Sequence, residues 1–352
     1  MKAVAKLHPT EAGIDVVDVV TPGIEAPTDV LVQVVISGIS GSEVNIWKGT
    51  YRRPNGQPVA PGRILGYEHA GVVVEAGDQA IRAGLLPGTT VGLSSPFIGC
   101  GRCEPCADGM INRCRAWGHI GITVDGTNCE VARLPMSVLE PSPEGVEPID
   151  LAFLNSAALA VRAVQRAGLT PGDRVIVFGP GPVGLLLLQA ARAGGAAWAG
   201  VVGLAQDVRR LEIARTLGAD ATFVFGDEIT SELRDATAGG ADVVLEAAGT
   251  PDAMRATVDA LRVGGTAVYA GLPPQKSATI EAIRVTRDEL TIRGVEGNLP
   301  ADRRRALKLL ASGAMRCRPF VTHEFSLADA EKAFQTVAAG EACKAVFALA
   351  PA

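Results

Sequence analysis

Hydrophobic and polar residues in the first 150 positions fall into short runs that are typical of β-strands. The clearest runs are DVLVQVV at residues 29–35 and HAGVVVEAG at residues 69–77, and clusters of Gly and Pro separate them from their neighbours. Short β-prone runs between such breakers predict strands joined by turns. We therefore expect a compact, strand-rich domain over residues 1–150.

From about residue 151 the pattern changes to strands that alternate with helices. The predicted order is strand 174–179, helix 183–193, strand 200–204, helix 207–217, strand 243–249, helix 254–261 and strand 264–272. Such alternation predicts βα units and a parallel sheet. We expect a doubly wound α/β domain over residues 151–290.

The remaining residues, 291–352, predict further elements. They contain a strand-like run at 291–297, a basic amphipathic helix around 302–310, a second helix after Ser326 and a final strand, CKAVFAL. Because the middle unit forms a complete sheet without them, we expect residues 291–352 to return to the first domain and complete it.

Composition narrows the class of protein. With 47% hydrophobic and 20% charged residues, the chain of 352 residues can bury substantial cores. A net charge of -5 and scattered basic residues argue against nucleic-acid binding. The chain starts without a signal-peptide pattern, and Gln189, Arg192 and several glycines interrupt its most apolar stretch. We expect a cytoplasmic protein that acts on a small molecule and binds neither nucleic acid nor membrane.

A glycine-rich loop follows the first predicted strand of the second domain. Gly179, Gly181 and Gly184 form G-x-G-x-x-G between the strand RVIVF and an apolar helix that starts around Pro182 and Val183. In dinucleotide sites the first glycine permits a tight turn, the second lets the pyrophosphate approach, and the third lets helix and strand pack closely. The phosphates then meet a helix N-terminus. A tight turn in any α/β protein is the alternative, but the flanking elements favour dinucleotide binding.

The choice between NAD and NADP depends on the end of the second strand. An acidic residue there binds the adenosine ribose and favours NAD. Counting back through the following helix places this position at Ala205, so no carboxylate repels a 2′-phosphate, and Arg209 or Arg210 offers a positive partner. Asp207 is the alternative ribose ligand, and both arginines also suit a solvated helix face. NADP(H) is therefore slightly favoured over NAD(H).

The cysteines point to a metal site. Four of the seven cysteines form C-x2-C-x2-C-x7-C, namely Cys100, Cys103, Cys106 and Cys114. Four thiolates close a tetrahedron around zinc and leave no open position, which makes such a site structural. Two disulfides, an iron–sulfur cluster or free thiols are the alternatives; the cytoplasmic context and the spacing argue against the first two. We expect one structural Zn²⁺ per chain in a lobe of about residues 96–116. The other cysteines are expected to be ordinary packed or free thiols: Cys129, Cys317 and Cys343.

These motifs together give the chain a family resemblance. With the cysteine lobe, GPGPVG at residues 179–184 and GYEHAGVVVEAGD at residues 66–78, the sequence resembles the zinc-type alcohol and polyol dehydrogenases of the medium-chain dehydrogenase/reductase superfamily, nearly end to end. The resemblance implies a GroES-like N-terminal domain completed by the C-terminal segment, an inserted Rossmann domain and an active site in the cleft between them. It also implies a homodimer or homotetramer, with residues 264–272 and 291–297 as candidate interface strands.

The resemblance fails at the catalytic zinc ligands. The family's first ligand, a cysteine in C-G-(T/S)-D, corresponds to Ser40, and the histidine of its G-H-E triplet corresponds to Tyr67. The third ligand, a cysteine or glutamate, falls at about Asn155. Catalytic zinc usually needs three imidazole, thiolate or carboxylate ligands, and only Glu68 remains nearby. We therefore expect no zinc at this site.

A makeshift zinc site is the one alternative. It would combine His69 with Glu43 or Glu68. The family's proton relay is altered as well, since Ser42 keeps the hydroxyl position while Asn45 replaces the relay histidine. A neutral amide takes up no proton at physiological pH.

Tyr67 is the first choice of general acid in the absence of zinc. Its phenol can donate a proton or a hydrogen bond where negative charge develops, with Ser42 and Ser40 as further hydrogen-bonding groups and Glu68 to orient neighbours. The alternative of equal weight is a tyrosine that fills the volume of the lost metal. Candidate pocket-lining residues, each equally consistent with packing, are Trp47, Tyr51 and Asn155.

Three functions follow from these expectations. The first is NAD(P)(H)-dependent reduction of an activated C=C or C=N bond, which needs no Lewis acid, and we favour it. The second is an alcohol or polyol dehydrogenase, or ketone reductase, in which Tyr67 and Ser42 replace the metal. The third is a non-catalytic cofactor-binding protein. A family name by itself would argue from fold rather than from the site.

Overall fold

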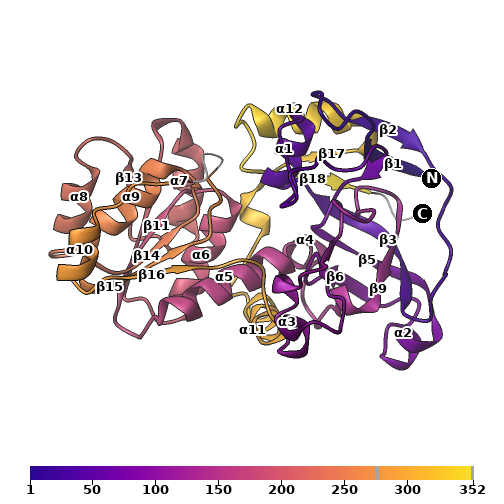
Figure 1. Cartoon of the computed structure of the whole chain (residues 1–352), viewed down its shortest axis with the longest axis horizontal. Helices are drawn as coiled ribbons and strands as arrows, with labels where there is room; N and C mark the ends of the chain where they lie inside the picture. The colour runs from indigo at the N-terminus through magenta and orange to yellow at the C-terminus, as the bar shows by residue number, and fades with distance from the viewer. Residues whose placement is uncertain (274–276, 350–352) are drawn as a thin grey trace. The chain divides into compact units, whose positions relative to one another are not determined.

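The computed structural model describes residues 1–273 and 277–349, and the chain forms two compact units (Figure 1). Unit 1 contains Met1–Asn155 together with Val321–Ala352, and unit 2 contains Ser156–Phe320. Within the described residues no helix is long and apolar enough to cross a membrane.

Unit 1 is the expected strand-rich domain. Its main sheet has the order β10-β6-β5-β3-β18-β17, with β9 paired to β3; β2-β1-β4 and β7-β8 form two smaller sheets. The strands are β1 (Lys2–Lys6), β2 (Asp15–Asp18), β3 (Asp29–Gly38), β4 (Arg63–Ile64), β5 (His69–Ala76), β6 (Thr90–Leu93), β7 (Phe97–Ile98), β8 (Gly118–His119), β9 (Val131–Pro135), β10 (Leu139–Pro141), β17 (Val321–Phe325) and β18 (Lys344–Ala348). The α-helices are α1 (Gly41–Trp47), α2 (Asp78–Arg82), α3 (Glu104–Ala107), α4 (Pro148–Leu151) and α12 (Ala330–Ala338).

Alternating side chains of β3 explain how unit 1 closes around two apolar clusters. Val30, Val32 and Val34 pack into one cluster, and the C-terminal segment supplies Phe334 and Phe347 to the other. Strand β18 pairs antiparallel with β3, and β5 pairs with the other edge of β3. The C-terminal segment is therefore part of the core of unit 1.

Unit 2 is a parallel six-stranded sheet of order β13-β12-β11-β14-β15-β16. Its strands are β11 (Arg174–Phe178), β12 (Trp198–Gly203), β13 (Ala221–Val224), β14 (Ala241–Glu246), β15 (Leu261–Tyr269) and β16 (Thr291–Gly294). Its helices are α6 (Pro182–Ala193), α7 (Val208–Thr216), α8 (Ile229–Ala236), α9 (Pro251–Asp259), α10 (Ala282–Arg287) and α11 (Pro300–Ala311), while α5 (Leu154–Ala167) spans the boundary with unit 1. The chain runs outward from β11 in one direction and from β14 in the other. Right-handed crossovers then put the connecting helices on opposite faces, which is the expected doubly wound Rossmann arrangement.

The structure changes two details of the expected domain plan. Residues 291–320 belong to unit 2, because β16 extends the parallel sheet beside β15; the returning segment starts at Val321 rather than at residue 291. The run at 264–272 is not a sheet edge either, since β15 pairs with both β14 and β16. Of the two candidate interface strands only β16 has an open edge, and the expected homo-oligomer stays a prediction.

Candidate functional site

The start of α1 positions the first group of predicted site residues. Ser40 is the N-cap, and its hydroxyl accepts from the Glu43 N–H at 3.3 Å while the Glu43 carboxylate accepts from the Ser40 N–H at 2.9 Å. This reciprocal arrangement satisfies two helix N–H groups that otherwise lack partners. Ser42 lies partly buried in the first turn, and Asn45 is exposed on the same helix. The capping geometry turns the Glu43 side chain into the protein.

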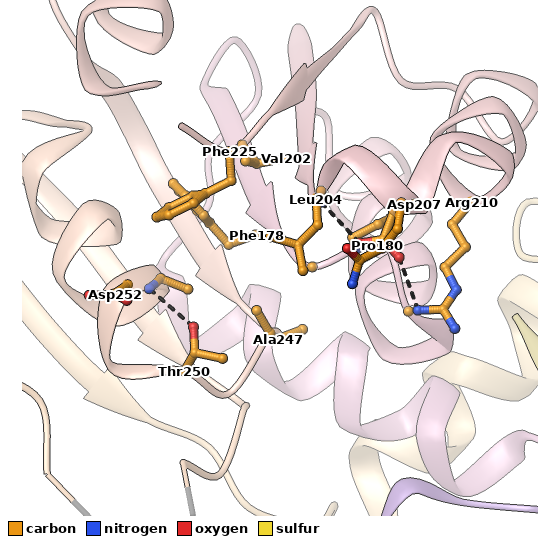
Figure 2. Close-up of a pocket in the computed structure, with 16 residues that line it drawn as sticks. Phe178, Pro180, Val202, Leu204, Asp207, Arg210, Phe225, Ala247, Thr250 and Asp252 are labelled. Carbon is orange, nitrogen blue, oxygen red and sulfur yellow. Dashed lines mark hydrogen bonds and ion pairs between the residues drawn. The ribbon is translucent and has the colours of Figure 1, made fainter. Parts of the chain in front are cut away.

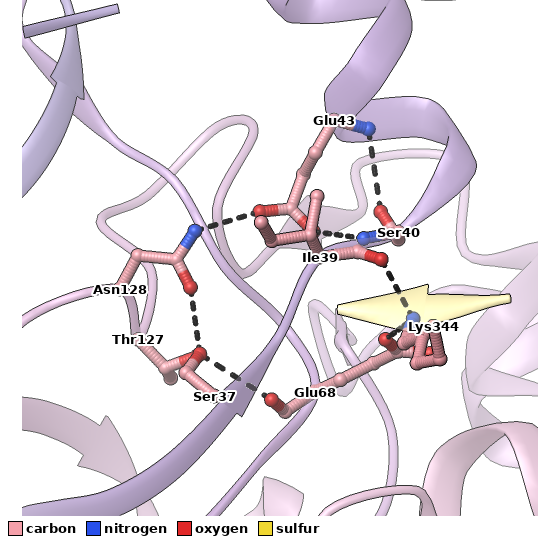
Figure 3. A network of polar contacts seen from close by, with 8 residues as sticks. All are labelled: Ser37, Ile39, Ser40, Glu43, Glu68, Thr127, Asn128 and Lys344. Atoms are coloured by element: carbon pink, nitrogen blue, oxygen red, sulfur yellow. Dashed lines mark hydrogen bonds and ion pairs between the residues drawn. The ribbon is translucent and has the colours of Figure 1, made fainter. Parts of the chain in front are cut away.

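Glu43 is the centre of a buried polar network (Figure 3). Its second carboxylate oxygen accepts from Asn128 Nδ2 at 2.8 Å, and Asn128 Oδ1 accepts from the Ser37 hydroxyl at 2.6 Å. Thr127 contacts the same hydroxyl at 3.3 Å. Burial raises the pKa of Glu43 to about 7, although the Ser40 hydrogen bonds and Lys344 act in the opposite direction. Glu43 therefore carries a proton that exchanges near neutral pH.

Glu68 forms a buried ion pair with Lys344 of β18. The two side chains are 6% and 5% exposed, and the ammonium also donates to the Ile39 carbonyl at 2.8 Å. The Phe153 ring lies 5.2 Å from the Lys344 nitrogen, in cation–π geometry. Glu68 is thus neutralised by a cation from the returning segment.

Tyr67 lies beside both carboxylates. Burial raises the pKa of Tyr67 above the ordinary value of 10.0, and the charges of Glu43 and Glu68 raise it further. Hydrogen bonds with Ser40 and Ser42 lower this pKa but do not offset the rise. Its ring meets His119 edge-to-face at a centroid distance of 5.1 Å. The structure thus brings together four predicted residues, Ser40, Ser42, Tyr67 and Glu68, and holds the phenol in its neutral form.

His69 is fully buried, and within the described part of the chain neither ring nitrogen has a hydrogen-bond partner. Burial lowers its pKa to about 3, so the imidazole is neutral. Among the described residues, His69, Glu43 and Glu68 do not form a group of three with ligand atoms close enough for one metal ion. A site made from His69 with one of the two carboxylates stays an alternative.

The three predicted pocket residues have different surroundings. The Trp47 indole N–H donates to both Glu331 carboxylate oxygens of α12, at 3.1 and 3.0 Å, and its ring packs on the second apolar cluster of unit 1. Tyr51 packs on that cluster too, and Asn155 lies partly buried in the first turn of α5. Trp47 and Tyr51 thus share a packing contact, and pocket roles for Trp47, Tyr51 and Asn155 stay predictions.

The cysteine lobe has the geometry of a metal site. Cys100, Cys103, Cys106 and Cys114 hold their sulfur atoms within 4.8 Å of one another, and Cys103 Sγ lies 3.8 Å from Cys114 Sγ. Zn–S bonds of about 2.3 Å in a tetrahedron require sulfur separations of about 3.8 Å, so the four thiolates fit zinc. Backbone N–H groups of Arg102 and Cys103 lower the pKa of Cys100 to about 6, which favours the thiolate. When bound, zinc would tie the loop between β7 and β8 together.

The glycine loop has the conformation that its motif predicts. Gly179 has φ +94°, and nothing lies within 4 Å of a Cβ placed on Gly181, which leaves that face open for a phosphate. A Cβ on Gly184 would lie 1.8 Å from the Gly179 oxygen, so only glycine lets α6 pack this closely. Gly181 is the N-cap of α6, with Pro182 and Val183 as its first residues. The loop fits a dinucleotide pyrophosphate.

A cavity of about 450 Å³, called here the cofactor pocket, lies beside this loop (Figure 2). Residues at the ends of β11 and β12 and in the segments that follow β11, β12, β13 and β14 line it: Phe178, Gly179, Pro180, Gly181, Val202, Gly203, Leu204, Gln206, Asp207, Arg210, Phe225, Ala247, Ala248, Thr250, Asp252 and Ala253. These positions are at the carboxyl ends of the strands, where the strand order reverses and doubly wound sheets bind ligands.

The expected ribose position lies just after β12. Strand β12 ends at Gly203, and Ala205 lies two residues beyond it in a 3₁₀ turn, beside Gln206 and Asp207, which line the pocket. A ribose contact at Ala205 stays a prediction. Asp207 and Arg210 line the pocket and contact each other at 3.2 Å, and Asp207 also accepts from the Leu204 N–H at 3.0 Å. Arg209 is exposed on α7 and does not line the pocket.

Sequence reasoning missed three residues of the Tyr67 site. Lys344 stands alone in the apolar run CKAVFAL, and a single lysine in a buried strand is a signal for a buried partner. His119 ends the short strand β8 and Asn128 lies in a bend, and no local pattern predicts where either segment runs. Their contacts with Tyr67 and Glu43 arise from tertiary packing alone.

The stability of the fold should depend on the ionisation of Glu43. Glu43 has a pKa of about 7 in the folded chain and an ordinary pKa of 4.5. Its protonated form therefore stabilises the fold fully below about pH 4.5, and this contribution is lost as pH rises through about 7. The melting temperature of Glu43→Gln minus that of the wild type should therefore increase from about pH 5 to about pH 8. The exposed Glu75→Gln is the control. A difference that is constant with pH would contradict the assignment.

Zinc content should follow the cysteine lobe. Elemental analysis of protein purified without chelators should give one zinc per chain, and Cys103→Ser should lose the zinc and melt at lower temperature, because a closed thiolate site adds its binding free energy to folding. Cys129→Ser, at a buried cysteine outside the lobe, should keep the zinc. Two zinc ions per chain, or zinc retained by Cys103→Ser, would overturn this expectation.

Two family models match the chain. The model described as Alcohol dehydrogenase GroES-like domain matches residues 26–144, and the model described as Zinc-binding dehydrogenase matches residues 182–312. The first match falls within unit 1 and the second within unit 2.

Relatives match over nearly the whole chain. Sorbitol dehydrogenase of Halalkalibacterium halodurans is 31% identical over 328 residues, which is 92% of this chain and 92% of the relative. Probable D-xylulose reductase A of Aspergillus fumigatus is 33% identical over 335 residues, covering 93% and 91%.

Solved structures agree with these matches. A putative zinc-binding dehydrogenase of Sinorhizobium meliloti bound to NADP has a TM-score of 0.86 at 29% identity and covers 99% of both chains. An alcohol dehydrogenase of Thermus sp. ATN1 has a TM-score of 0.87 at 28% identity and covers 99% of this chain and 100% of that one. The chain therefore belongs to the zinc-type alcohol and polyol dehydrogenases of the medium-chain dehydrogenase/reductase superfamily, and it is an NAD(P)-dependent oxidoreductase.

Proposed function

We propose that this oxidoreductase works without catalytic zinc and reduces an activated C=C or C=N bond of a small molecule. The observation that carries the proposal is the state of Glu68. It is an anionic donor directly after Tyr67, one of the positions that correspond to the family's zinc ligands, and Lys344 neutralises it. Ser40, Tyr67 and Asn155 offer only a hydroxyl, a phenol and an amide, which do not make a zinc site at neutral pH. These residues do not fit a catalytic zinc.

Tyr67 supplies the proton in the proposed reaction. The bound nicotinamide provides a hydride, which needs an electron-poor carbon as its acceptor. The Tyr67 hydroxyl then donates its proton to the neighbouring atom, where the electron pair of the double bond has collected, and regains a proton from solvent. Hydrogen bonds with Ser40 and Ser42 orient the phenol. The substrate gains two hydrogen atoms in all, and the cofactor leaves oxidised.

The raised pKa of Tyr67 favours reduction over alcohol oxidation. A phenol with its pKa above 10.0 stays protonated at neutral pH, so it can donate a proton but has no free base position to take one from an alcohol. A polyol dehydrogenase or ketone reductase that uses Tyr67 and Ser42 is the second candidate, because sorbitol dehydrogenase and D-xylulose reductase are among the relatives.

Removal of the Tyr67 hydroxyl tests the proposal. The wild type should oxidise NADPH or NADH in the presence of conjugated enals, enones or cyclic imines, and Tyr67→Phe should be slower by about a hundredfold or more, because the proton donor is lost. Its cofactor affinity and melting temperature should be unchanged. Unchanged turnover would return Tyr67 to a packing role. Turnover of polyols or ketoses alone would favour the second candidate, and no turnover of any of these would leave a cofactor-binding protein.

We infer that the cofactor pocket slightly favours NADP(H). Gly203 ends β12 without a side chain, and the Asp207 carboxylate is already engaged by the Leu204 N–H and by Arg210. The Arg210 guanidinium remains at the pocket wall as a partner for a 2′-phosphate.

Two neighbouring arginines of α7 provide a matched test of this preference. Arg210→Ala should raise KM for NADPH by about tenfold or more, since a hydrogen bond to a charged group contributes about 1.5–3 kcal/mol, and should change KM for NADH little. Arg209→Ala removes an exposed arginine outside the pocket and should change neither. A clear preference of the wild type for NADH would refute the inference.

A further inference from the structure

Asn128 is a fully buried polar residue that contacts two of the segments that build the Tyr67 site. It lies in a bend and is 0% exposed. Each end of its side-chain amide has a partner: the Ser37 hydroxyl donates to Oδ1 at 2.6 Å, and Nδ2 donates to the Glu43 carboxylate at 2.8 Å (Figure 3). A buried amide is costly unless its groups are hydrogen-bonded, so the Ser37 contact fixes the NH₂ group toward Glu43.

The backbone of Asn128 holds the segment that leads into Tyr67. Its N–H donates to the Leu65 carbonyl at 2.8 Å, and the neighbouring Thr127 N–H donates to the Gly66 carbonyl at 3.1 Å. The two segments pack closely, since a Cβ on Gly66 would lie 2.5 Å from both Asn128 N and Asn128 Oδ1. These main-chain bonds do not depend on the side chain at position 128, so a substitution there should leave the Tyr67 backbone in place.

The side chain of Asn128 holds the start of α1. It binds one carboxylate oxygen of Glu43, and the other oxygen accepts from the Ser40 N–H at 2.9 Å, within the capping box. Ser40 in turn hydrogen-bonds with the Tyr67 phenol. A chain of hydrogen bonds therefore runs from the Asn128 amide through Glu43 and Ser40 to the phenol of Tyr67.

We propose that Asn128 is a positioning residue for the proton donor. Its amide ties the start of α1 to the segment before Tyr67 and so sets where Ser40 lies relative to the phenol. Misplacement of a reacting group by about 1 Å can cost about a hundredfold in rate. The inference rests on the proposed role of Tyr67 as general acid, and a measurement on the phenol itself separates the failure of one from the failure of the other.

Fluorine NMR can observe the phenol directly. The chain has three tyrosines, so the full-length protein labelled with 3-fluorotyrosine should give three resonances, and the one that is lost in Tyr67→Phe belongs to Tyr67. Asn128→Leu keeps a side chain of similar size but removes its hydrogen-bonding groups. We expect the Tyr67 resonance to move or broaden in this variant, while those of Tyr51 and Tyr269 stay unchanged. Thr127→Val is the matched control, because Thr127 is equally buried in the same segment, and it should change none of the three.

An exchange of groups between Asn128 and Glu43 tests the hydrogen bond that carries the proposal. In the double variant with Asn128→Asp and Glu43→Gln, the amide donor moves to position 43 and the carboxylate acceptor to position 128. The Ser37 hydroxyl and the Ser40 N–H then keep an acceptor each, and the net charge is unchanged. For reduction of an activated alkene or imine, kcat should fall by about tenfold in Asn128→Leu and return to within about twofold of the wild type in the double variant.

Three results would overturn the proposal. The first is a Tyr67 resonance and a kcat that Asn128→Leu leaves unchanged. The second is a double variant as slow as Asn128→Leu, and the third is an equal change at all three tyrosines, which would show a general structural role. A wild type that reduces none of the acceptors would contradict the proposed reaction instead, and the fluorine spectra would still decide whether Asn128 positions the phenol.

Discussion

The buried ion pair between Glu68 and Lys344 is the interaction on which unit 1 and its site depend. It joins residues that are 276 positions apart in the chain and so fastens the returning segment to the start of β5. Loss of one partner of such a pair costs about 3–5 kcal/mol, because the other charge is left buried without compensation. Gly38 shows how tightly the pair is enclosed, since a Cβ there would lie 2.8 Å from Glu68 Oε2 and 2.9 Å from the Phe153 ring.

This ion pair also determines the electrostatics around Tyr67. Because Lys344 balances Glu68, the remaining uncompensated carboxyl is Glu43, which satisfies its oxygens with Asn128 and the Ser40 N–H instead of a cation. Burial and hydrogen bonding thus leave Glu43 with a pKa of about 7. The site holds a neutral phenol, a neutral imidazole at His119, whose pKa burial lowers to about 4, and one carboxyl that is protonated in part.

The sequence predicted the parts of the structure that depend on local chemistry. The glycine loop and the four-cysteine lobe were predictable because steric and coordination constraints act over a few neighbouring residues. Ala205 lies in a 3₁₀ turn two residues after β12 ends, so its contact with the ribose depends on a turn that the sequence pattern does not specify. The start of the returning segment was predicted at residue 291 instead of Val321. The sequence of an edge strand such as β16 is the same kind of pattern whether the strand extends the sheet of unit 2 or joins a sheet of unit 1.

Long-range contacts explain the rest of what the sequence could not show. Lys344 contacts Glu68 because β18 pairs with β3. Asn128 contacts Glu43, and His119 contacts Tyr67, through tertiary packing of segments that are distant in sequence.

In the proposed reaction, the direction of catalysis depends on protonation rather than on the family. A zinc-bound alcohol loses its proton because the metal stabilises the alkoxide, and that stabilisation requires a dication with three anionic or imidazole ligands. In this chain Tyr67 stands at the position of one of these ligands, and burial and two neighbouring carboxylates oppose the ionisation of its phenol. An alkoxide formed there would be opposed by burial and by the same carboxylates, and the tyrosinate that remains after proton donation must regain its proton from solvent. The proposed reaction therefore takes an electron-poor substrate and releases a neutral product.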